Sequence, residues 1–527
     1  MTRWGSRLGL LAILAGTAAL RLRLLAVPLD RDEGEYAYMG QLILRGETPY
    51  LAAHNMKLPG VYYAYAGIIG LLGETDVAIR LGLLAITLGS LTLLYLIGRR
   101  LLDATAGLTA AAAYAVLSLG QAVDGFTANA EHFVVLPMLA GVLLLTPPVP
   151  RTLARIAAAG VLLGVAVVMK QHGAAFVAFG GLWVLGTGLR VAGWRRTVRE
   201  CLLFAAAALV PYAVVCLAMW RAGAGAEFWF WTVTYARFYA GMTPVGAGFA
   251  QLLRTAGDFA RTAPALWLLV GVGLTTPWWD APARRAAAFV GWFTLCSAAA
   301  VAAGWRFTEH YFVLGLPAAS LIAGAAVSAL GRLADRRRPA IATAVRVALP
   351  VLAVLVSLVR ERAYLFTLSP SAVARATYGL NPFPEAVGIA RQLRERTQPG
   401  DRVAVIGSEP QIYFYAGRHA ATSYIYMYPL METHPFARRM QEDMIAQLER
   451  ERPRFLVLVN VDTSWSRRPE SSLAVMEWAE RVTATDYHVV GLTEILPDGT
   501  SVEHWDAAAQ DVTPRSRTYV LVFERNG

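Results

Sequence analysis

Four acidic side chains lie within six positions near the N-terminus, directly after an apolar stretch. They are Asp30, Asp32, Glu33 and Glu35 in the run DRDEGEY. Carboxylates packed this densely at the edge of an apolar run are costly unless they bind a cation or activate a hydroxyl. A solvated loop end is the plain alternative. The cluster predicts a site for cation binding or for general-base chemistry.

Three later polar segments, each between apolar runs, carry further residues of the kinds that act in catalysis. They hold Asp124 and Glu131 in QAVDGFTANAEHF, Lys170 with Gln171 and His172, and Arg306, Glu309, His310 and Tyr311 in GWRFTEHYF. Lys57 and Lys170 are the only lysines among the 48 basic residues. Lysine is a compact point charge suited to a phosphate. The segments therefore predict an anionic headgroup held beside a catalytic carboxylate, with Asp124, Lys170, His310 and Tyr311 as substrate-binding candidates. For Lys170, snorkelling at a helix end is the alternative.

The composition indicates what must position these loops. Of 527 residues, 56% are hydrophobic and 16% are charged, against roughly 25% charged in soluble proteins. A chain this long and apolar is best explained by membrane spans plus one extra domain. The net charge of +11 does not indicate nucleic acid, because the arginines sit in short clusters between apolar runs. The three cysteines fall inside apolar runs and are read as small buried hydrophobes.

About eleven apolar stretches are long enough to cross a membrane, which needs about 17 to 20 residues. Their approximate ranges are 8–28, 78–98, 104–120, 131–147, 154–170, 173–189, 201–220, 263–277, 286–303, 310–330 and 341–360. The stretch from Pro59 to Gly73 is too short, and we expect it to re-enter or to lie on the surface. The first stretch is predicted to be an uncleaved span, because Arg21 and Arg23 interrupt it and no A-x-A site follows. These two arginines are expected to snorkel or to find anions.

Every second loop is basic, which predicts the orientation. The basic clusters are Arg3 and Arg7; Arg99 and Arg100; Arg151 and Arg155; Arg190, Arg195, Arg196 and Arg199; Arg284 and Arg285; and Arg332, Arg336, Arg337 and Arg338. Cytoplasmic loops carry the excess of Lys and Arg. The N-terminus is therefore predicted inside, and residues beyond 361 outside, in the periplasm or its equivalent.

After the last span, short β-branched runs alternate with polar helical stretches. Strands are predicted at 402–408, 454–460 and 519–525, and helices near 384–397, 434–451 and 470–482. This alternation is typical of a small α/β domain, and it lacks a Gly-rich phosphate loop. The predicted fold is a polytopic α-helical membrane domain over residues 1–364, with its first external loop at 30–77, followed by an extracytoplasmic α/β domain over 365–527.

The first loop resembles that of the GT-C glycosyltransferases. The resemblance is carried by Asp32-Glu33-x-x-Tyr36, by Lys57-Leu58-Pro59 and by Arg80 at the start of a span. It is closest to bacterial relatives of protein O-mannosyltransferases and of the lipid A aminoarabinose transferase, and it covers mainly the N-terminal half. The family has Lys-Pro-Pro where this chain has Lys-Leu-Pro. The resemblance implies a multi-span bundle in a bacterial inner membrane, often followed by an external domain.

The resemblance also implies roles for individual residues. Asp32 matches the acid thought to act on the acceptor, Glu33 its neighbour, and Glu131 a second catalytic acid. Lys57 matches a lysine near the lipid phosphate, and Tyr36 and Arg80 complete the expected substrate contacts. His54 is a candidate metal ligand, although a lone loop histidine is more often polar surface. No cofactor is therefore assigned, and a divalent metal stays open.

The function implied is transfer of a sugar from a polyprenyl-phosphate-linked donor to a hydroxyl of a lipid, polysaccharide or protein acceptor, with inversion. A transporter or flippase of lipid-linked anions is the alternative. It needs the same cations but no base, and its charged residues should continue through the bundle. A membrane-anchored scaffold that uses only the external domain leaves the acidic loop unexplained.

Overall fold

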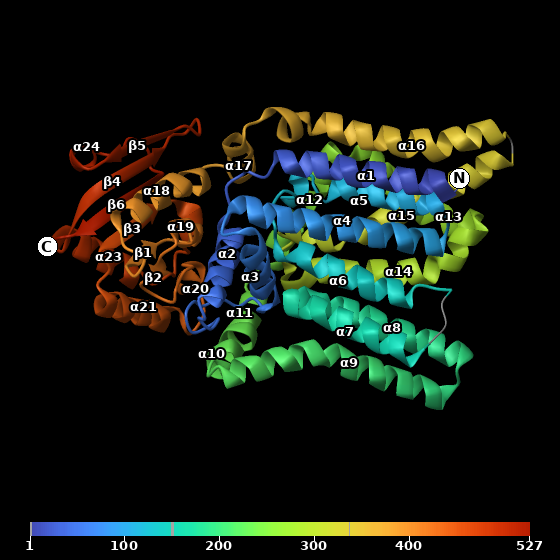
Figure 1. The fold of residues 1–527 in the computed structure, drawn as a ribbon, viewed down its shortest axis with the longest axis horizontal. Coiled ribbons are helices and arrows are strands. Elements are labelled where there is room, and N and C mark those ends of the chain that lie inside the picture. Colours follow the sequence, from blue (N-terminus) through green and yellow to red (C-terminus); the bar gives the residue numbers. More distant parts are fainter. Residues whose placement is uncertain (1–2, 149–151, 337) are drawn as a thin grey trace.

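The protein consists of a long helical bundle with a sheet domain at one end (Figure 1). The computed structural model describes residues 3–148, 152–336 and 338–527. Arg151 and Arg337, which belong to two of the predicted basic loops, lie outside the described residues. The polytopic helical fold with a small C-terminal sheet domain confirms the predicted fold class.

Seven helices of the described chain are long and apolar enough to cross a membrane. They are α1 (Arg3–Arg23), α4 (Asp76–Leu101), α8 (Ala174–Val191), α9 (Trp194–Arg221), α14 (Ala281–Ala302), α15 (Leu316–Asp335) and α16 (Pro339–Arg360). An eighth candidate is the pair α12 (Val245–Thr262) and α13 (Pro264–Trp279), bent by 107°.

Three predicted spans are shorter than expected. They are α5 (Ala104–Leu117), α6 (Ala130–Leu145) and α7 (Leu153–Met169), with 14 to 17 residues each. At 1.5 Å per residue, fourteen residues reach only about 21 Å, against a hydrocarbon core of about 30 Å. The count of eleven crossings therefore stays a prediction.

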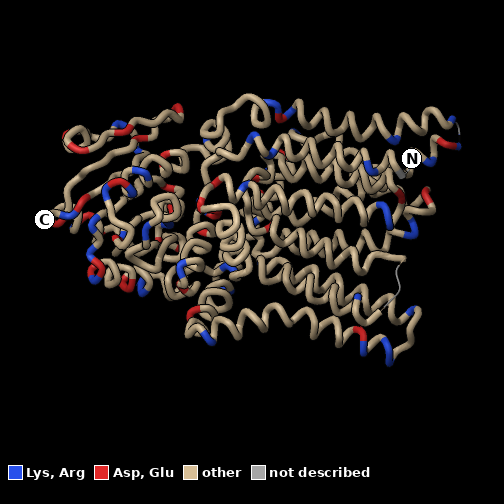
Figure 2. The backbone as a smooth tube through the Cα atoms, viewed as in Figure 1, with Lys and Arg blue, Asp and Glu red and all other residues tan. Residues whose placement is uncertain are grey.

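Charged residues gather at the two ends of the bundle and in the sheet domain, and the middle of the bundle is almost free of them (Figure 2). The N-terminus lies at the bundle end away from the sheet domain, where α8 meets α9 and α15 leads towards α16 (Figure 1). Alternate connections thus share one end, as the spacing of the arginine clusters predicts. Which side of the membrane this end faces stays a prediction.

The chain between α1 and α4 forms a platform between the bundle and the sheet domain. Its helices are α2 (Arg31–Leu44) and α3 (Gly60–Leu72). Helix α2 begins with a capping box, in which Asp30 accepts from the Glu33 N–H at 2.8 Å and Glu33 accepts from the Asp30 N–H at 3.3 Å. The stretch from Pro59 to Gly73 forms α3, which packs on α2.

Short helices of the bundle connections complete this end of the molecule. They are η1 (Gln121–Val123), η2 (Gln171–Gly173), α10 (Gly225–Trp229), the π-helix η3 (Phe230–Tyr235), α11 (Ala236–Ala240), η4 (Ala303–Trp305), η5 (Glu309–Leu314), the π-helix η6 (Ala363–Thr367) and α17 (Pro370–Tyr378). Several of these place polar residues beside α2.

The C-terminal domain is a six-stranded mixed sheet with helices around it. Its strands are β1 (Arg402–Ile406), β2 (His419–Ala420), β3 (Phe455–Asn460), β4 (Tyr487–Ile495), β5 (Ser501–Trp505) and β6 (Tyr519–Arg525), in the order β2-β1-β3-β6-β4-β5. β1 pairs in parallel with β2 and β3, and the other pairs are antiparallel. The helices are α18 (Phe383–Arg396), α19 (Gln411–Ala416), α20 (Tyr428–Met431), α21 (Ala437–Glu451), α22 (Asp462–Trp465), α23 (Ala474–Thr485) and α24 (Ala507–Gln510).

The predicted strands and helices of this domain are confirmed, but β2, β4 and β5 were missed. β5 is polar, with residues that are exposed or only half-buried, so its sequence lacks the apolar alternation of a strand. β4 follows directly on the end of α23, with no glycine or proline between them to mark a boundary.

The platform and the sheet domain share one apolar core, which includes Tyr38 and Met39 of α2 as well as Ile406 and Phe414. Helix α2 meets α19 at Gly34, where a Cβ atom would lie only 2.6 Å from the Gln411 backbone nitrogen. The first loop is therefore held between the bundle and the sheet domain, and the C-terminal domain is packed onto the residues that could do chemistry.

Candidate active site

A cavity of about 920 Å³ lies where the bundle, the platform and the sheet domain meet. Its lining comes from residues far apart in the sequence, from Asp30 to Pro429. The predicted residues that line it are Asp32, Lys57, Asp124, Lys170, His310 and Tyr311. The structure thus brings the candidates of four separate segments to one space, which is large enough for a small-molecule site.

The central pair is Asp32 and Lys57. The Lys57 ammonium lies 3.1 Å from Asp32 Oδ1 and 2.7 Å from Glu35 Oε2. It also lies 4.6 Å from the centre of the Tyr36 ring, a favourable cation–π contact. The tyrosine predicted to bind substrate is itself fully buried beneath the lysine, so it supports the lysine rather than lining the cavity.

Glu35 was part of the acidic cluster, but no role was predicted for it. It is fully buried, with one oxygen on Lys57 and the other accepting from the Tyr62 hydroxyl at 2.6 Å. The Lys57 carbonyl accepts from the Tyr50 hydroxyl at 2.7 Å. Together these contacts fix the lysine from below and leave Asp32 as the carboxylate of the pair that faces the cavity.

The electrostatics of this pair favour charge on both partners. Burial opposes ionisation of Asp32, but Lys57, His310 and the Tyr426 hydroxyl outweigh it and hold the pKa of the Asp32 carboxyl well below its usual range. Burial likewise opposes the charge on Lys57, but the two carboxylates beside it raise the pKa of its ammonium. The site is therefore an ionised pair at neutral pH, with a hydrogen-bond acceptor and a cation side by side.

A second cluster is formed by the predicted residues of the later segments. Lys170 forms an ion pair with Glu131, and its ammonium lies 4.2 Å from the centre of the Tyr311 ring. His310 Nε2 lies 3.9 Å from Glu131 Oε1. Glu131 is fully buried and does not line the cavity, whereas Lys170 does. The predicted second acid thus holds a lysine in place and is not presented to substrate.

Two other predicted site residues, Glu33 and Arg80, form a separate ion pair outside the cavity lining. Both are almost fully buried. Glu33 also accepts from the Ala128 N–H at 2.6 Å, and Arg80 donates to the Val27 carbonyl at 3.3 Å. Neither Arg80 nor Glu33 therefore lines the cavity in this structure. The sequence pattern Asp30-x-x-Glu33 before a helix is a capping-box signal that could have revealed this.

The two arginines at the outer end of α1 contact backbone carbonyls, and neither forms an ion pair with an acid among the described residues. Arg21 is buried and donates to the carbonyls of Gly125 and Ser118 at 3.0 and 3.1 Å. Arg23 donates to the Leu368 carbonyl at 2.7 Å. They join α1 to neighbouring loops through backbone oxygens.

Asp124 lines the cavity, with a backbone φ of 51°. Burial raises the pKa of its carboxyl well above the ordinary value.

His54, the candidate metal ligand, has both ring nitrogens in hydrogen-bond contacts. Nδ1 lies 2.8 Å from the Tyr50 carbonyl and Nε2 lies 2.8 Å from Ser423 Oγ. Its ring stacks on Trp231 at 5.1 Å. In the described parts of the chain no three or more His, Cys, Asp and Glu side chains are grouped to hold a metal ion. The residues around His54 do not fit a metal ion.

The C-terminal domain supplies cavity residues that sequence reasoning missed. Tyr426 donates to Asp32 Oδ1 at 2.6 Å, and Tyr428 and Tyr378 also line the cavity. The Arg306 guanidinium, from the fourth predicted segment, lies 3.5 Å from the centre of the Tyr239 ring. It also lies 3.6 Å from Glu432 of the C-terminal domain. No local pattern marks these tyrosines, because their partners lie hundreds of residues away.

Comparison with known proteins identifies the fold. Residues 56–220 match the family model described as dolichyl-phosphate-mannose-protein mannosyltransferase. The chain also resembles the crystal structure of ArnT from Cupriavidus metallidurans bound to undecaprenyl phosphate, with a TM-score of 0.59 and 16% identity over 99% of this chain and 98% of that one. The fold is that of the GT-C glycosyltransferases.

A second GT-C structure matches over less of its own length. The archaeal oligosaccharyltransferase AglB from Archaeoglobus fulgidus, in complex with an inhibitory peptide and a dolichol-phosphate, gives a TM-score of 0.53 and 13% identity over 96% of this chain and 75% of that one. No curated protein matches the sequence. The predicted resemblance is thus confirmed at the level of the GT-C fold, and the roles of individual residues stay predictions.

Asp30 gives this site a testable pH dependence. Burial and the neighbouring Asp32 charge raise the pKa of Asp30 from 3.8 to about 6. The folded state thus holds this proton more tightly than the unfolded state. Ionisation of Asp30 therefore destabilises the fold as the pH rises from about 4 to 6.

The variant Asp30→Asn keeps the helix cap without the charge. We expect Asp30→Asn to gain up to about 3 kcal/mol over wild type at pH 7.5, and little at pH 4. Thermal unfolding in detergent at both pH values measures this, and an equal difference at the two values would contradict it.

Proposed function

We propose that this protein is a membrane glycosyltransferase that moves a sugar from a polyprenyl-phosphate-linked donor to an acceptor hydroxyl. The observation that carries the proposal is the Asp32–Lys57 pair, which joins an ionised carboxylate to a cation 3.1 Å away at the wall of the cavity. Transfer of a sugar from a lipid phosphate needs both groups. The carboxylate accepts a hydrogen bond from the attacking hydroxyl, and cations stabilise the phosphate as it leaves.

Asp32 acts as the base in this reaction. While it is paired with Lys57 its pKa is low, so it orients the hydroxyl more than it removes the proton. When the donor phosphate takes up part of the Lys57 charge, the hold on Asp32 weakens and its basicity rises. Donor binding thus prepares the base, and the base strengthens as the sugar–phosphate bond breaks.

Lys57, Lys170 and His310 are the proposed partners of the phosphate, with Arg306 as a further cation. All four line the cavity. A single displacement by the acceptor oxygen, with no enzyme nucleophile, inverts the anomeric centre. The acceptor oxygen forms its bond to the anomeric carbon as its proton passes to Asp32, and the lipid phosphate departs with the electron pair of the broken bond.

The donor class is supported by the relatives. The matching family model is described by a dolichyl-phosphate sugar, and ArnT and AglB bind undecaprenyl phosphate and a dolichol-phosphate. We also propose that the protein is a multi-pass protein of a bacterial inner membrane. The alternating arginine clusters predict a cytoplasmic N-terminus, with the cavity and the C-terminal domain extracytoplasmic. Lipid, polysaccharide and protein hydroxyls are the acceptor classes to be tested.

The transporter alternative predicts charged residues along the bundle. Figure 2 shows charged residues at the ends of the bundle and very few in its middle, so an anion would cross a long apolar region without partners. The scaffold alternative predicts a C-terminal domain independent of the loop. The apolar core shared by the platform and the sheet domain, and the Tyr426–Asp32 hydrogen bond, argue against the scaffold alternative.

The test is sugar transfer by the purified full-length protein in nanodiscs. A panel of radiolabelled polyprenyl-phosphate sugars serves as donors and membrane extract as acceptor, and the anomeric configuration of the product is read by NMR. We expect transfer from one donor of the panel, with inversion. If the protein binds donor in nanodiscs without any transfer, and moves donor across the membrane when it is reconstituted in sealed vesicles, the transporter replaces this proposal.

A further inference from the structure

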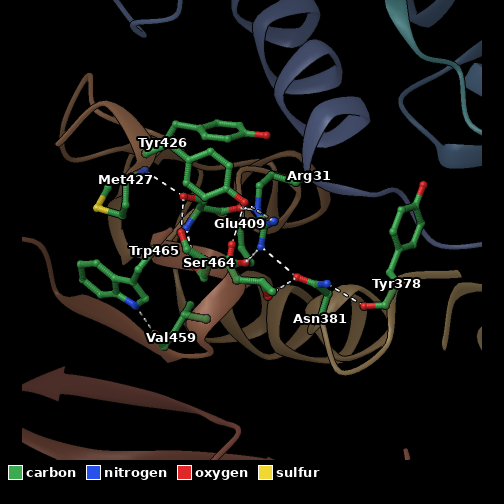
Figure 3. A network of polar contacts seen from close by, with 12 residues as sticks. Arg31, Tyr378, Asn381, Glu409, Tyr426, Met427, Val459, Ser464 and Trp465 are labelled. Carbon is green, nitrogen blue, oxygen red and sulfur yellow. Dashed lines mark hydrogen bonds and ion pairs between the residues drawn. The ribbon is translucent and has the colours of Figure 1, made fainter. Parts of the chain in front are cut away.

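Arg31 and Asp32, two neighbours at the start of α2, both contact the C-terminal domain. The Arg31 guanidinium donates to the Ser408 carbonyl at 2.6 Å and to Glu409 Oε1 at 2.8 Å. Figure 3 shows it among the residues of this domain, where Glu409 is fully buried and its second oxygen accepts from Ser464 Oγ at 2.6 Å. The N-terminal turn of α2 is therefore anchored in a rigid, charge-assisted network.

The network closes on itself through Ser408. The Ser408 hydroxyl accepts from the Met427 N–H at 2.8 Å, and Met427 follows Tyr426 in the sequence. Tyr426 donates to Asp32 Oδ1 at 2.6 Å, and Asp32 follows Arg31. The ring of contacts thus runs from Arg31 through Ser408, Met427 and Tyr426 back to Asp32. A closed ring leaves a side chain fewer free torsions than an open chain, so it restricts the Asp32 carboxylate more tightly than one hydrogen bond does.

The two oxygens of Asp32 have different surroundings. Oδ1 accepts a hydrogen bond from the Tyr426 hydroxyl at 2.6 Å and forms an ion pair with the Lys57 ammonium at 3.1 Å. Oδ2 has no hydrogen-bond partner among the described residues. The side chain is 24% exposed and lines the cavity. Oδ1 is therefore the anchored oxygen, and Oδ2 is the oxygen left to meet an incoming hydroxyl.

We propose that Tyr426 is a positioning residue of the transfer reaction: it fixes Asp32 Oδ1 so that Oδ2 faces the acceptor. The inference rests on the proposed function of Asp32 as the base. Tyr426 does not act as a base itself, because its hydroxyl proton is already directed at the carboxylate. The C-terminal domain thereby completes the active site of the membrane domain, since a base displaced by about 1 Å loses most of its effect.

The test removes the hydroxyl and keeps the ring. Tyr426→Phe is compared with wild type and with Tyr424→Phe, a matched control two residues away whose hydroxyl donates to Asp443 at 3.0 Å and whose side chain does not line the cavity. The first measurement does not depend on transfer. It is the rate at which a carbodiimide labels the Asp32 carboxyl at pH 5, read by peptide mass spectrometry and normalised to Asp258, which lines the same cavity.

Carbodiimides react with the protonated carboxyl, and loss of the Tyr426 hydrogen bond raises the pKa of Asp32. We expect Tyr426→Phe to label about ten-fold faster, as a change of one pKa unit requires, and Tyr424→Phe to label as wild type does. The second measurement is transfer with saturating extract. We expect kcat to fall about ten-fold, comparable to one hydrogen bond to a charged group, with the Kd for undecaprenyl phosphate unchanged.

The outcomes separate this inference from the proposed function. Equal Asp32 labelling in wild type and Tyr426→Phe overturns the inference, whether or not the protein transfers sugar. Faster labelling with an unchanged kcat also overturns it, because the anchored oxygen then has no role in the reaction. Faster labelling in a protein that binds donor but never transfers it supports the ring around Asp32 and overturns the transferase.

Discussion

Asp32→Asn is expected to lower sugar transfer by roughly 10²- to 10⁴-fold, the usual contribution of a general base. Asn has nearly the shape of Asp and can still accept from the Tyr426 hydroxyl, so the fold and the cavity stay intact. It carries no charge and cannot accept the acceptor proton. The measurement is the initial rate of transfer in nanodiscs, together with the affinity for undecaprenyl phosphate.

Donor affinity should not fall in this variant. Asp32→Asn removes one of the two carboxylates that compete with a phosphate for Lys57, so undecaprenyl phosphate is expected to bind as well as, or better than, in wild type. Asp258→Asn is the matched control, because Asp258 lines the same cavity but pairs with Arg261. Transfer by Asp32→Asn within a factor of two of wild type would show that another group activates the acceptor.

Glu33→Ala is expected to damage folding rather than chemistry, although Glu33 is adjacent to the proposed base. It leaves Arg80 buried, 3% exposed, without its carboxylate, and breaking a buried pair in this way costs about 3–5 kcal/mol. That is a large part of the total stability of a typical domain. The measurement is thermal unfolding in detergent, with transfer normalised to the folded fraction.

The control for this prediction is Glu47→Ala. Glu47 is an exposed glutamate near α2 that lies 3.7 Å from His419, and its loss should change stability by less than about 1 kcal/mol. If Glu33→Ala unfolds at the wild-type temperature and yet cannot transfer sugar, Glu33 belongs to the catalytic residues, as the family resemblance implies.

Much of the membrane domain follows from local patterns. Apolar runs predict the long helices, and β-branched runs predict β1, β3 and β6, because both patterns indicate which segments are removed from water. Alternating arginine clusters predict which connections share one end of the bundle. Asp32 and Lys57 belong to one loop of fewer than fifty residues, so their meeting at one site is also within reach of the sequence.

The remainder depends on tertiary contacts that leave no local trace. Arg80 carries the charge expected of a phosphate ligand, but the capping geometry of α2 turns Glu33 towards it and away from the cavity. Tyr426 lies 394 positions from Asp32 in the sequence. The residues next to Tyr426 indicate only an aromatic loop and predict no contact with Asp32. Such partners are set by how the C-terminal domain packs on α2, which periodicity and spacing do not specify.

The scarcity of lysine allows the cavity to be observed selectively. Lys57 and Lys170 both line the cavity, and the chain has no other lysine. Biosynthetic incorporation of lysine that carries carbon-13 at Cε would therefore place its NMR probes only in the cavity. Each resonance would report the charge around one ammonium as ligands arrive, without any engineered label in a 527-residue membrane protein.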